Sequence, residues 1–572
     1  MMDQIFNMDN WLNLLSFNKE EPLIFTTVIF WYFFGAVLLV YSIIHKHAAL
    51  RNAFLFLVSI FFYYKTSQWF FSLLLFSTIS DYLIGFRIHA AQGVKRKLWL
   101  ALSVTINLLI LIYFKYSYFF ADSFNALLGT EWHPINHFAL LSNQFFGSSF
   151  DFMTIGLPVG ISFYTFQTIS YGIDVYRKDV EPVKSILDFG FYVSFFPQLV
   201  AGPIVRAADF IPQIYKKYHL DRFTFGMAFF WILNGLVKKL VLSDYLALNF
   251  IDRVFDSPGS YTGFENLMAL YGYSLQVYAD FSGYTDIAIG VAMLLGFTLP
   301  QNFNSPYKAH SVGNFWKRWH ISLSTWLKDY LYIPMGGNRG GSVFSMVSLS
   351  FIVLFVFLIS GSWIVLGMII LVLGLSYLLG RFVPAFKNWS TTNINVMMTM
   401  LIGGLWHGAS WNFVIWGGLN GLGLVVFKLW NKVSPWANKS KWYNRAWGVF
   451  LTFQFISFTR IWFRSGSNNS WENINEPHEI MKELFTANTM LNKILKVDFS
   501  VAPEILLAFA PVFALMFIGM VIHLIPERIK VMYRQFFANA PIAAQISMGV
   551  AAIILLYQVY SADAQPFIYF QF

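Results

Sequence analysis

Long apolar runs separated by short polar connectors extend along nearly the whole chain. The first run, Leu23–Ile44, carries no charge and is long enough to cross the roughly 30 Å hydrocarbon core of a bilayer as a helix. Because no small-residue cleavage site accompanies it, we expect an anchor and not a removed signal peptide. Further apolar runs lie at Ala53–Tyr64, Trp69–Phe86, Leu98–Phe114, Phe152–Ile173, Phe189–Val205, Phe225–Leu236, Phe264–Ala279, Gly290–Leu299, Ile394–Trp406, Trp411–Phe427, Trp447–Phe463, Ile505–Ile525 and Ile542–Tyr560. The pattern predicts an all-α polytopic membrane protein with about 13 to 15 transmembrane and re-entrant helices.

The longest uncharged stretch is Gly340–Gly380. At 1.5 Å per residue it would form roughly 60 Å of helix, about twice the thickness of the hydrocarbon core. One crossing cannot accommodate this length, so we expect two crossings joined by a turn at Ser360–Ser362. The sequence therefore predicts a two-helix segment at about residues 343–380.

The composition agrees with a membrane protein. Hydrophobic residues make up 57% of the chain and charged residues only 12%, whereas a soluble domain carries about 25% charged residues. A soluble enzyme is excluded, because a globule of this size has no means of hiding so much apolar surface. The largest polar connectors, Ala121–Asp151 and Ser465–Ala502, are too short for an extramembrane domain. We therefore expect a single membrane-embedded domain over residues 1–572.

The absence of cysteine and the net charge narrow the chemistry. With no cysteine in the chain, disulfides, cysteine-ligated metals and a cysteine nucleophile are all excluded. The formal net charge is +10, which in a multi-pass protein reflects basic cytoplasmic loops beside anionic lipid. We therefore expect contacts with membrane lipids and no nucleic-acid partner.

His407 is the first candidate for chemistry, because it lies in the otherwise uncharged stretch Ile394–Phe427. Gly403, Gly404 and Gly408 surround it, and such small residues suggest the wall of a cavity. Histidine is the side chain whose ordinary pKa suits proton transfer near neutrality, so a general-base role is favoured. The alternative is a structural histidine that forms a hydrogen bond across a helix pair.

His320 lies in a second candidate segment that is rich in aromatic and basic residues. Trp316, His320 and Ser324 recur every four residues, so a helix would place the imidazole between an indole and a hydroxyl. With Lys317 and Arg318 nearby, the segment is typical of an amphipathic helix in the headgroup region. Alternatively, the basic residues bind the phosphates of a donor such as coenzyme A. An aromatic face would carry Phe315, Trp319, Leu323, Trp326 and Tyr330.

Other polar residues favour structural roles. Asp280 and Asp286 would point to different faces of one helix, so we interpret them as structural hydrogen-bonding groups and not as an acid–base pair. His133 and His137 have the spacing of metal ligands, but Pro134 between them argues against a zinc site. We expect no metal site in this chain.

An ordered series of motifs resembles the membrane-bound O-acyltransferase (MBOAT) family, and within it the bacterial branch for alginate and peptidoglycan O-acetylation. The likeness covers nearly the entire chain, and the linked motifs are far more specific than any one of them. The resemblance rests mainly on the motifs Phe315–Ser322, Asp329–Pro334, Gly336–Arg339 and Gly404–Gly408. Supporting stretches are Pro158–Tyr164, Phe196–Gln198, Ala201–Ile204, Asp280–Tyr284 and Phe567–Phe570.

The resemblance implies a ring of helices around a central acyl-transfer tunnel, with His407 as the essential histidine and His320 as the second. It implies acetyl-CoA as the donor substrate, with no tightly bound cofactor. The acceptor would be a hydroxyl of an extracytoplasmic polysaccharide or peptidoglycan, reached in some systems through a periplasmic SGNH-type transferase. One departure is the two-helix segment between Arg339 and His407, which relatives usually lack. This extra segment would change the side of the protein that binds the acceptor and the surface on which a partner docks.

The functional hypothesis is an O-acyltransferase of the bacterial cytoplasmic (inner) membrane that moves an acetyl group from cytoplasmic acetyl-CoA to an external hydroxyl. His407 would act as general base and His320 would orient the acyl group. The nucleotide-binding candidates are Trp316, Lys317, Arg318 and Arg339. The rival hypothesis is a transporter or flippase of lipid-linked saccharides that uses the histidines as a proton relay. The identity of the polymer and the choice between direct transfer and an acyl-histidine stay open.

Overall fold

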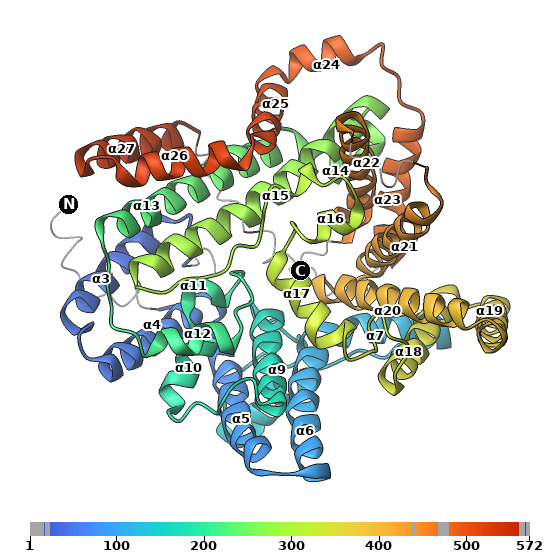
Figure 1. Ribbon diagram of the computed structural model, residues 1–572, viewed down its shortest axis with the longest axis horizontal. Coiled ribbons are helices and arrows are strands. Elements are labelled where there is room, and N and C mark those ends of the chain that lie inside the picture. The colour runs from blue at the N-terminus through green and yellow to red at the C-terminus, as the bar shows by residue number, and fades with distance from the viewer. Residues whose placement is uncertain (1–15, 18–22, 436–440, 467–479, 560–566, 568–572) are drawn as a thin grey trace.

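The computed structural model describes residues 16–17, 23–435, 441–466, 480–559 and 567. Within these ranges every regular element is helical (Figure 1), which confirms the predicted all-α class. The α-helices are α3 (Val28–Ile44), α4 (Ala48–Ser67), α5 (Phe71–Ala90), α6 (Gly93–Leu111), α7 (Ser117–Leu128), α8 (His137–Phe146), α9 (Ile161–Arg177), α10 (Ile186–Ser194), α11 (Phe196–Leu199), α12 (Ala207–Ile214), α13 (Arg222–Leu236), α14 (Asp252–Asp256), α15 (Gly263–Leu294), α16 (Val312–Trp316), α17 (Ile321–Trp326), α18 (Val343–Ser360), α19 (Trp363–Phe382), α20 (Pro384–His407), α21 (Trp411–Val433), α22 (Trp442–Gly466), α23 (Ile480–Leu495), α24 (Ala502–Ala508), α25 (Ala510–Leu524), α26 (Glu527–Asn539) and α27 (Ile542–Val559).

Shorter helical turns of other types connect several of these helices. The π-helical turns are η2 (Ile112–Tyr116), η3 (Val237–Asp244), η4 (Ala247–Ile251) and η7 (Leu327–Tyr332). The 3-10 turns are η1 (Gln68–Phe70), η5 (Pro258–Ser260) and η6 (Pro306–Lys308). The π-helical turns matter below because η2 and η3 carry lysines that contact the candidate site and its neighbouring cavity.

At 32 residues, α15 is the longest helix in the described part of the chain, and it lies against α13 in the interior (Figure 1). A capping box begins it, because the Thr262 hydroxyl accepts the Glu265 N–H at 3.2 Å and the Glu265 carboxylate accepts the Thr262 N–H at 2.8 Å. Glycine lets the two helices approach closely, since a Cβ on Gly235 would lie 2.5 Å from the Gly283 carbonyl oxygen. The closely packed pair forms one wall of the interior.

The helices α20 and α21 form a second close pair. A Cβ on Gly404 would lie 2.3 Å from the Phe413 carbonyl oxygen, and one on Gly417 would lie 2.3 Å from the Met400 carbonyl oxygen. A Cβ on Gly408 would lie 2.1 Å from the Phe413 ring. The interpretation of these glycines as a cavity wall is therefore wrong for Gly404 and Gly408. Their missing side chains allow α21 to pack closely against α20, and they do not line a ligand cavity.

Five helical segments of the described chain are long and apolar enough to cross a membrane, or up to seven if each of two bent helix pairs forms one span. They are Ala48–Ala90, Gly93–Leu128, Arg222–Asp256, Trp363–Phe382 and Trp411–Val433. This number is below the expected total of about 13 to 15, which included re-entrant helices. Several interior helices are short or partly polar, as in the 17-residue α9, which buries Gln167 and Asp174. The protein is an integral, multi-pass membrane protein.

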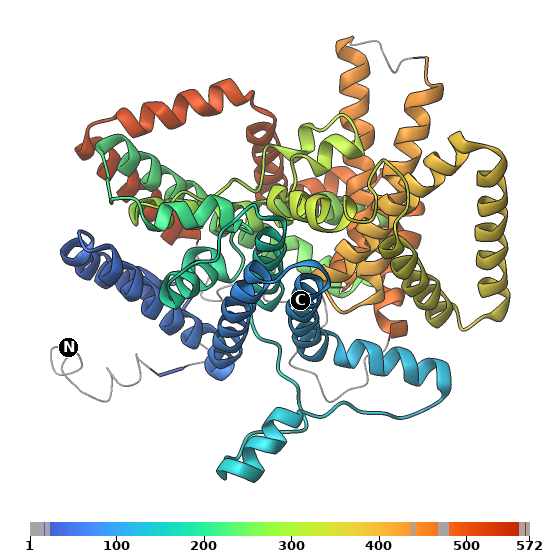
Figure 2. The same cartoon turned by 60° about the horizontal axis from the view of Figure 1, so that its bottom comes forward.

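The predicted two-helix segment is present as α18 and α19, and both figures place it at the rim of the molecule (Figures 1 and 2). The turn lies where the sequence predicts it, at Gly361, whose φ of +55° suits glycine. Trp363 and Tyr377 are 75% and 74% exposed, as expected for side chains that face lipid. The single-domain assignment over 1–572 and the status of this hairpin as an addition stay predictions.

The segment around His320 is not the continuous amphipathic helix that its aromatic spacing predicts. Helix α16 ends before it and α17 begins after it, and His320 itself has a left-handed backbone with φ of +42°. Trp319 is only 2% exposed, so the aromatic face packs into the interior and not into the headgroup region. The Ser324 hydroxyl donates to the Trp319 carbonyl at 3.2 Å. The predicted surface helix is therefore wrong, because tertiary packing breaks and buries it.

Candidate functional site

The structure brings the two predicted histidines together. The centroids of the His320 and His407 rings lie 6.4 Å apart, although the residues belong to motifs on different elements. His407 is the last residue of α20, which points toward the centre of the molecule beside α17 (Figure 1). The rings are 0% and 3% exposed, respectively. Two imidazoles in one buried, largely aromatic environment form the centre of the candidate site.

Contacts from η2 hold the end of α20 that carries His407. The last carbonyls of an α-helix have no partner within the helix, so other groups must satisfy them. The Nζ of Lys115 donates to the carbonyl of Trp406 at 2.8 Å and to that of His407 at 3.1 Å. The Tyr116 hydroxyl donates to the Leu405 carbonyl at 2.7 Å. A buried cation at a helix C-terminus also interacts favourably with the helix dipole.

Lys115 was not predicted from the sequence as a site residue. Its Nζ also donates to the Ser162 hydroxyl at 3.1 Å, so this 5%-exposed ammonium binds neutral oxygens from α9 and α20. The only local signal was a lysine directly after the apolar run Leu98–Phe114. Its role depends on segments far away in the chain.

The backbone at His320 is held by an asparagine from a neighbouring loop. A non-glycine residue in the left-handed region carries a strain of order 1–3 kcal/mol. The following residues are fixed by Asn302, whose carbonyl accepts the Ile321 N–H at 2.9 Å and whose Oδ1 accepts the Ser322 N–H at 3.2 Å. Strained backbone that surrounding contacts hold in place is typical of functional sites.

Aromatic rings surround both imidazoles. The Trp406 ring centroid lies 5.9 Å from that of His320 and 5.0 Å from that of His407. The Trp416 and Phe463 rings lie 5.1 and 5.3 Å from His407. The ring of Phe281 lies 4.6 Å from that of His320. This aromatic shell excludes bulk water from the histidine pair, which strengthens electrostatic interactions inside it.

Arg460 on α22 is a second residue that the sequence did not single out. It is 1% exposed, and its Cζ lies 4.3 Å from the Trp319 ring centroid and 5.1 Å from that of Phe463. These are cation–π distances. Among the described residues no carboxylate forms an ion pair with it. The buried Arg460 guanidinium therefore packs behind the aromatic shell, against Trp319, the residue before His320.

The predicted nucleotide-binding residues lie in different surroundings. Lys317 and Arg339 are exposed. Arg318 is half-buried and donates to Asn314 Oδ1 at 3.1 Å and to the Asn304 carbonyl at 2.9 Å. The Trp316 ring lies 5.7 Å from Trp416, which links it to the shell around His407. That these four residues bind the nucleotide part of the acyl donor stays a prediction.

The buried aspartates form ion pairs. Asp280 accepts from Lys239 at 2.6 Å and Asp286 accepts from Lys238 at 2.6 Å. Lys238 also donates to the Ser282 hydroxyl at 2.8 Å, so it bridges Ser282 and Asp286. These contacts confirm a structural role that joins α15 to η3. Of the supporting motif at residues 567–570, only Phe567 is described, and its ring lies 4.5 Å from that of Tyr284.

Comparison with known proteins shows which sequences this chain resembles. Residues 180–389, which include His320, match the family described as MBOAT, membrane-bound O-acyltransferase family. The "Probable alginate O-acetylase AlgI" of Azotobacter vinelandii is 38% identical over 387 residues, 66% of this chain and 64% of the relative. The protein of the same name from Pseudomonas aeruginosa is 35% identical over 445 residues, 77% of this chain and 70% of the relative.

A relative from another branch aligns over a longer region. The "Peptidoglycan O-acetyltransferase" of Helicobacter pylori is 31% identical over 484 residues, which is 79% of each chain. The chain spans less than two thirds of the length of the Azotobacter relative, at 64%. The extent of these alignments, with both histidine motifs in one buried pair, leads to one assignment. The chain belongs to the membrane-bound O-acyltransferase family.

Proposed function

We propose that this protein is a membrane O-acyltransferase that moves an acetyl group from cytoplasmic acetyl-CoA to a hydroxyl on the outer side of the bacterial inner membrane. The acceptor is a polysaccharide or peptidoglycan, reached directly or through a periplasmic SGNH-type transferase. The observation that carries the proposal is the 6.4 Å separation of the His320 and His407 rings within one buried aromatic shell. The names of the relatives, which concern alginate and peptidoglycan O-acetylation, support the substrate class.

The proposed reaction needs one base and one group that polarises a carbonyl. His407 takes the proton of the acceptor hydroxyl as its oxygen attacks the thioester carbonyl carbon. The new C–O bond forms, the C–S bond breaks, and the coenzyme A thiolate takes up the proton from His407. His320, whose ring lies 6.4 Å from that of His407, orients the acyl group and stabilises the developing oxyanion. The direct route requires no covalent acyl-enzyme.

Both reactants must reach a ring that is 3% exposed. We therefore expect side chains of the aromatic shell, such as Trp406 and Trp416, to rotate when the donor binds. The exposed Lys317 and Arg339 would attract the nucleotide phosphates at the cytoplasmic mouth. Arg318 would contribute from its half-buried position beside Asn304.

The test uses inside-out membrane vesicles that contain the protein and receive radiolabelled acetyl-CoA at their exposed cytoplasmic face. Alginate or peptidoglycan fragments enclosed in the vesicles serve as acceptors. We expect label in the enclosed polymer, and we expect His407→Ala to lower it about 100-fold or more, which is the usual contribution of a general base. His133→Ala, at an exposed histidine, is the matched control.

Label that is incorporated equally by the His407→Ala variant would remove this histidine from the mechanism. A flippase or transporter would move lipid-linked saccharide across the membrane without transferring label from acetyl-CoA. The same vesicles therefore distinguish the two classes of function, because the acetyl group itself is followed.

A further inference from the structure

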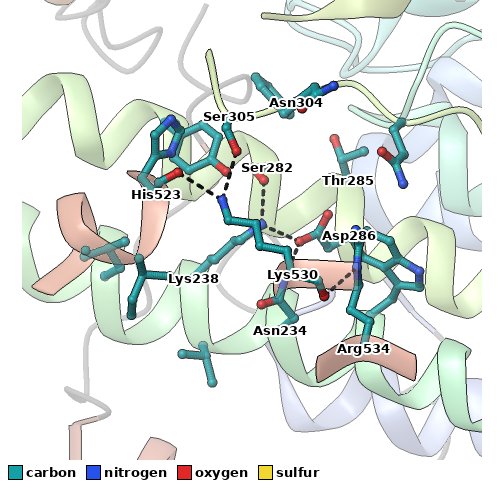
Figure 3. A pocket seen from close by; sticks show the side chains of 18 of the residues that line it. Asn234, Lys238, Ser282, Thr285, Asp286, Asn304, Ser305, His523, Lys530 and Arg534 are labelled. Carbon is teal, nitrogen blue, oxygen red and sulfur yellow. Dashed lines mark hydrogen bonds and ion pairs between the residues drawn. The ribbon is translucent and has the colours of Figure 1, made fainter. Parts of the chain in front are cut away.

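A cavity of about 390 Å³ lies beside the histidine pair, between α13, η3, α15, α25 and α26 (Figure 3). The loop of residues 301–305 separates it from His320. The ring of Phe303, from this loop, lies 5.1 Å from those of Trp319 and Phe281. The cavity is thus distinct from the histidine pair but shares a wall with it.

Basic side chains dominate the polar end of the cavity. Lys238, Lys530 and Arg534 line it together with the carboxylates of Asp286 and Glu527, which leaves an excess of positive charge. Figure 3 shows the ammonium groups of Lys530 and Lys238 on the cavity side of their helices. Lys238 pairs with Asp286 at 2.6 Å and Arg534 pairs with Glu527 at 2.5 Å.

Lys530 differs from the other two cations. Its Nζ donates to the Ser305 hydroxyl at 2.9 Å and to the His523 carbonyl at 3.0 Å, which are both neutral acceptors. No carboxylate of the described chain forms an ion pair with it. An ammonium has three donors, so one more acceptor, best an anion, fits at this point of the cavity.

The opposite wall is apolar and extends to the outer surface of the protein. Ile518 and Ile522 of α25 line the cavity, and each is 51% exposed, so the apolar wall continues onto an exposed apolar face of α25. Helix α26 carries Lys530 and Arg534, whereas Lys238 lies on η3. Helix α26 follows α25 and runs away from its end (Figure 1), as an amphipathic helix does at a membrane surface. The aliphatic residues of this wall include Val237, Val241, Leu242, Leu515, Ile518 and Ile522.

Two buried polar groups on the cavity wall have unused hydrogen-bonding capacity. Asn302 Nδ2 and Thr285 Oγ1 have no hydrogen-bond partner among the described residues, and both side chains are 1% exposed. Buried polar groups in folded proteins are nearly always satisfied, so a ligand with oxygen acceptors in this cavity would supply partners for both groups. Asn302 is also the residue that holds Ile321 and Ser322 beside His320.

We propose that this cavity binds an acidic phospholipid, with its phosphate at Lys530 and an acyl chain along the apolar face of α25. The cationic end at the membrane surface and the apolar wall along a membrane helix match the two halves of such a lipid. Its glycerol and ester oxygens lie within the part of the cavity lined by Asn302 and Thr285. The bound lipid fixes the loop of residues 301–305 and, through Asn302, the backbone at His320. This last effect rests on the proposed acyl-transfer function, whereas the binding itself does not.

The test measures lipid binding directly. The purified protein in a zwitterionic detergent is titrated with phosphatidylglycerol or phosphatidylcholine, and bound lipid is counted by native mass spectrometry. We expect phosphatidylglycerol to bind preferentially, and Lys530→Gln to weaken that binding about fivefold, the effect of one lysine against an acidic lipid. Arg528→Gln removes the same charge from an exposed position of the same helix and serves as the matched control.

Equal binding of both lipids, or an unchanged affinity in Lys530→Gln, would overturn the proposal. Competition by coenzyme A or inorganic phosphate would also overturn it, because the cavity would then bind a free phosphate compound and not a lipid. Lys530→Arg, which keeps the charge, should retain the preference, so that a loss confined to Lys530→Gln is assigned to the missing charge. A lipid preference without any acetyl transfer would leave the binding site intact and reject the proposed function.

Discussion

The Nζ of Lys115 lies 3.1 Å from the carbonyl oxygen of His407 and 2.8 Å from that of Trp406. Lys115 of η2 thus caps the C-terminus of α20, the helix that carries the candidate base His407. The contact involves the backbone carbonyl of His407, whereas the imidazole contacts the aromatic shell. Lys115 is therefore a positioning residue.

We predict that Lys115→Met preserves the fold but misplaces His407. Methionine fills a similar volume and removes every donor to the two carbonyls, so the end of α20 is free to shift. A displacement of about 1 Å at a reacting group can lower kcat by about 100-fold. Acetyl transfer in vesicles and thermal melting in detergent measure the two effects. Lys432→Met, at an exposed lysine, is the control. Unchanged kcat would contradict the positioning role.

Arg460 is expected to contribute through its contact with the Trp319 ring at 4.3 Å. A desolvated cation–π contact contributes about 2 kcal/mol, so its loss in Arg460→Leu should lower kcat about 30-fold. The apparent KM for acetyl-CoA should stay nearly unchanged, because the residue lies behind the shell. Arg460→Lys keeps a cation and should recover part of the rate. Equal rates for the leucine and lysine variants would exclude the cation–π explanation.

The phosphate-binding role of the basic segment has its own test. Lys317→Glu with Arg318→Glu should raise the apparent KM for acetyl-CoA by about tenfold or more, since like charges repel across the binding surface. Lys317→Glu alone separates this effect from a structural one, because Arg318 also donates to the Asn304 carbonyl. The effect should weaken at high salt. A KM that does not change would count against donor binding by this segment.

The close contact between α20 and α21 predicts a position that does not accept larger side chains. At Gly404 a Cβ would lie 2.3 Å from the Phe413 carbonyl oxygen, so Gly404→Leu must force the helices apart. We expect a loss of about 3 kcal/mol in stability, near the upper end for overpacked sites. Gly374→Leu on α19, where nothing lies within 4 Å, is the matched control. Equal melting temperatures for the two variants would contradict the contact.

Much of this arrangement was predictable from the sequence. The apolar runs gave the all-α membrane class, and the motifs around His320 and His407 gave the pair that the structure brings together. The backbone break at His320 was not predictable. It depends on Asn302, whose contacts with Ile321 and Ser322 form only when the loop of residues 301–305 packs against α17. Aromatic spacing alone favoured an unbroken helix.

The residues that sequence reasoning missed share a physical cause. Lys115 binds backbone carbonyls on α20, and Arg460 lies against rings from other elements. Neither contact leaves a periodic or spacing signal near the residue itself. The glycines around His407 show a related ambiguity, because small residues suit a cavity wall and a tight helix contact equally well. Only the position of α21 decides between the two.

Because the backbone at His320 is left-handed, stability and the proposed activity favour different residues at this position. Alanine and glycine variants would leave nearly the same void, yet glycine adopts this conformation without steric conflict. His320→Gly should therefore melt higher than His320→Ala by an amount equivalent to about 1 kcal/mol, while both remain inert. A sequence chosen for stability alone would place glycine here, so we expect the imidazole to serve the proposed acyl transfer.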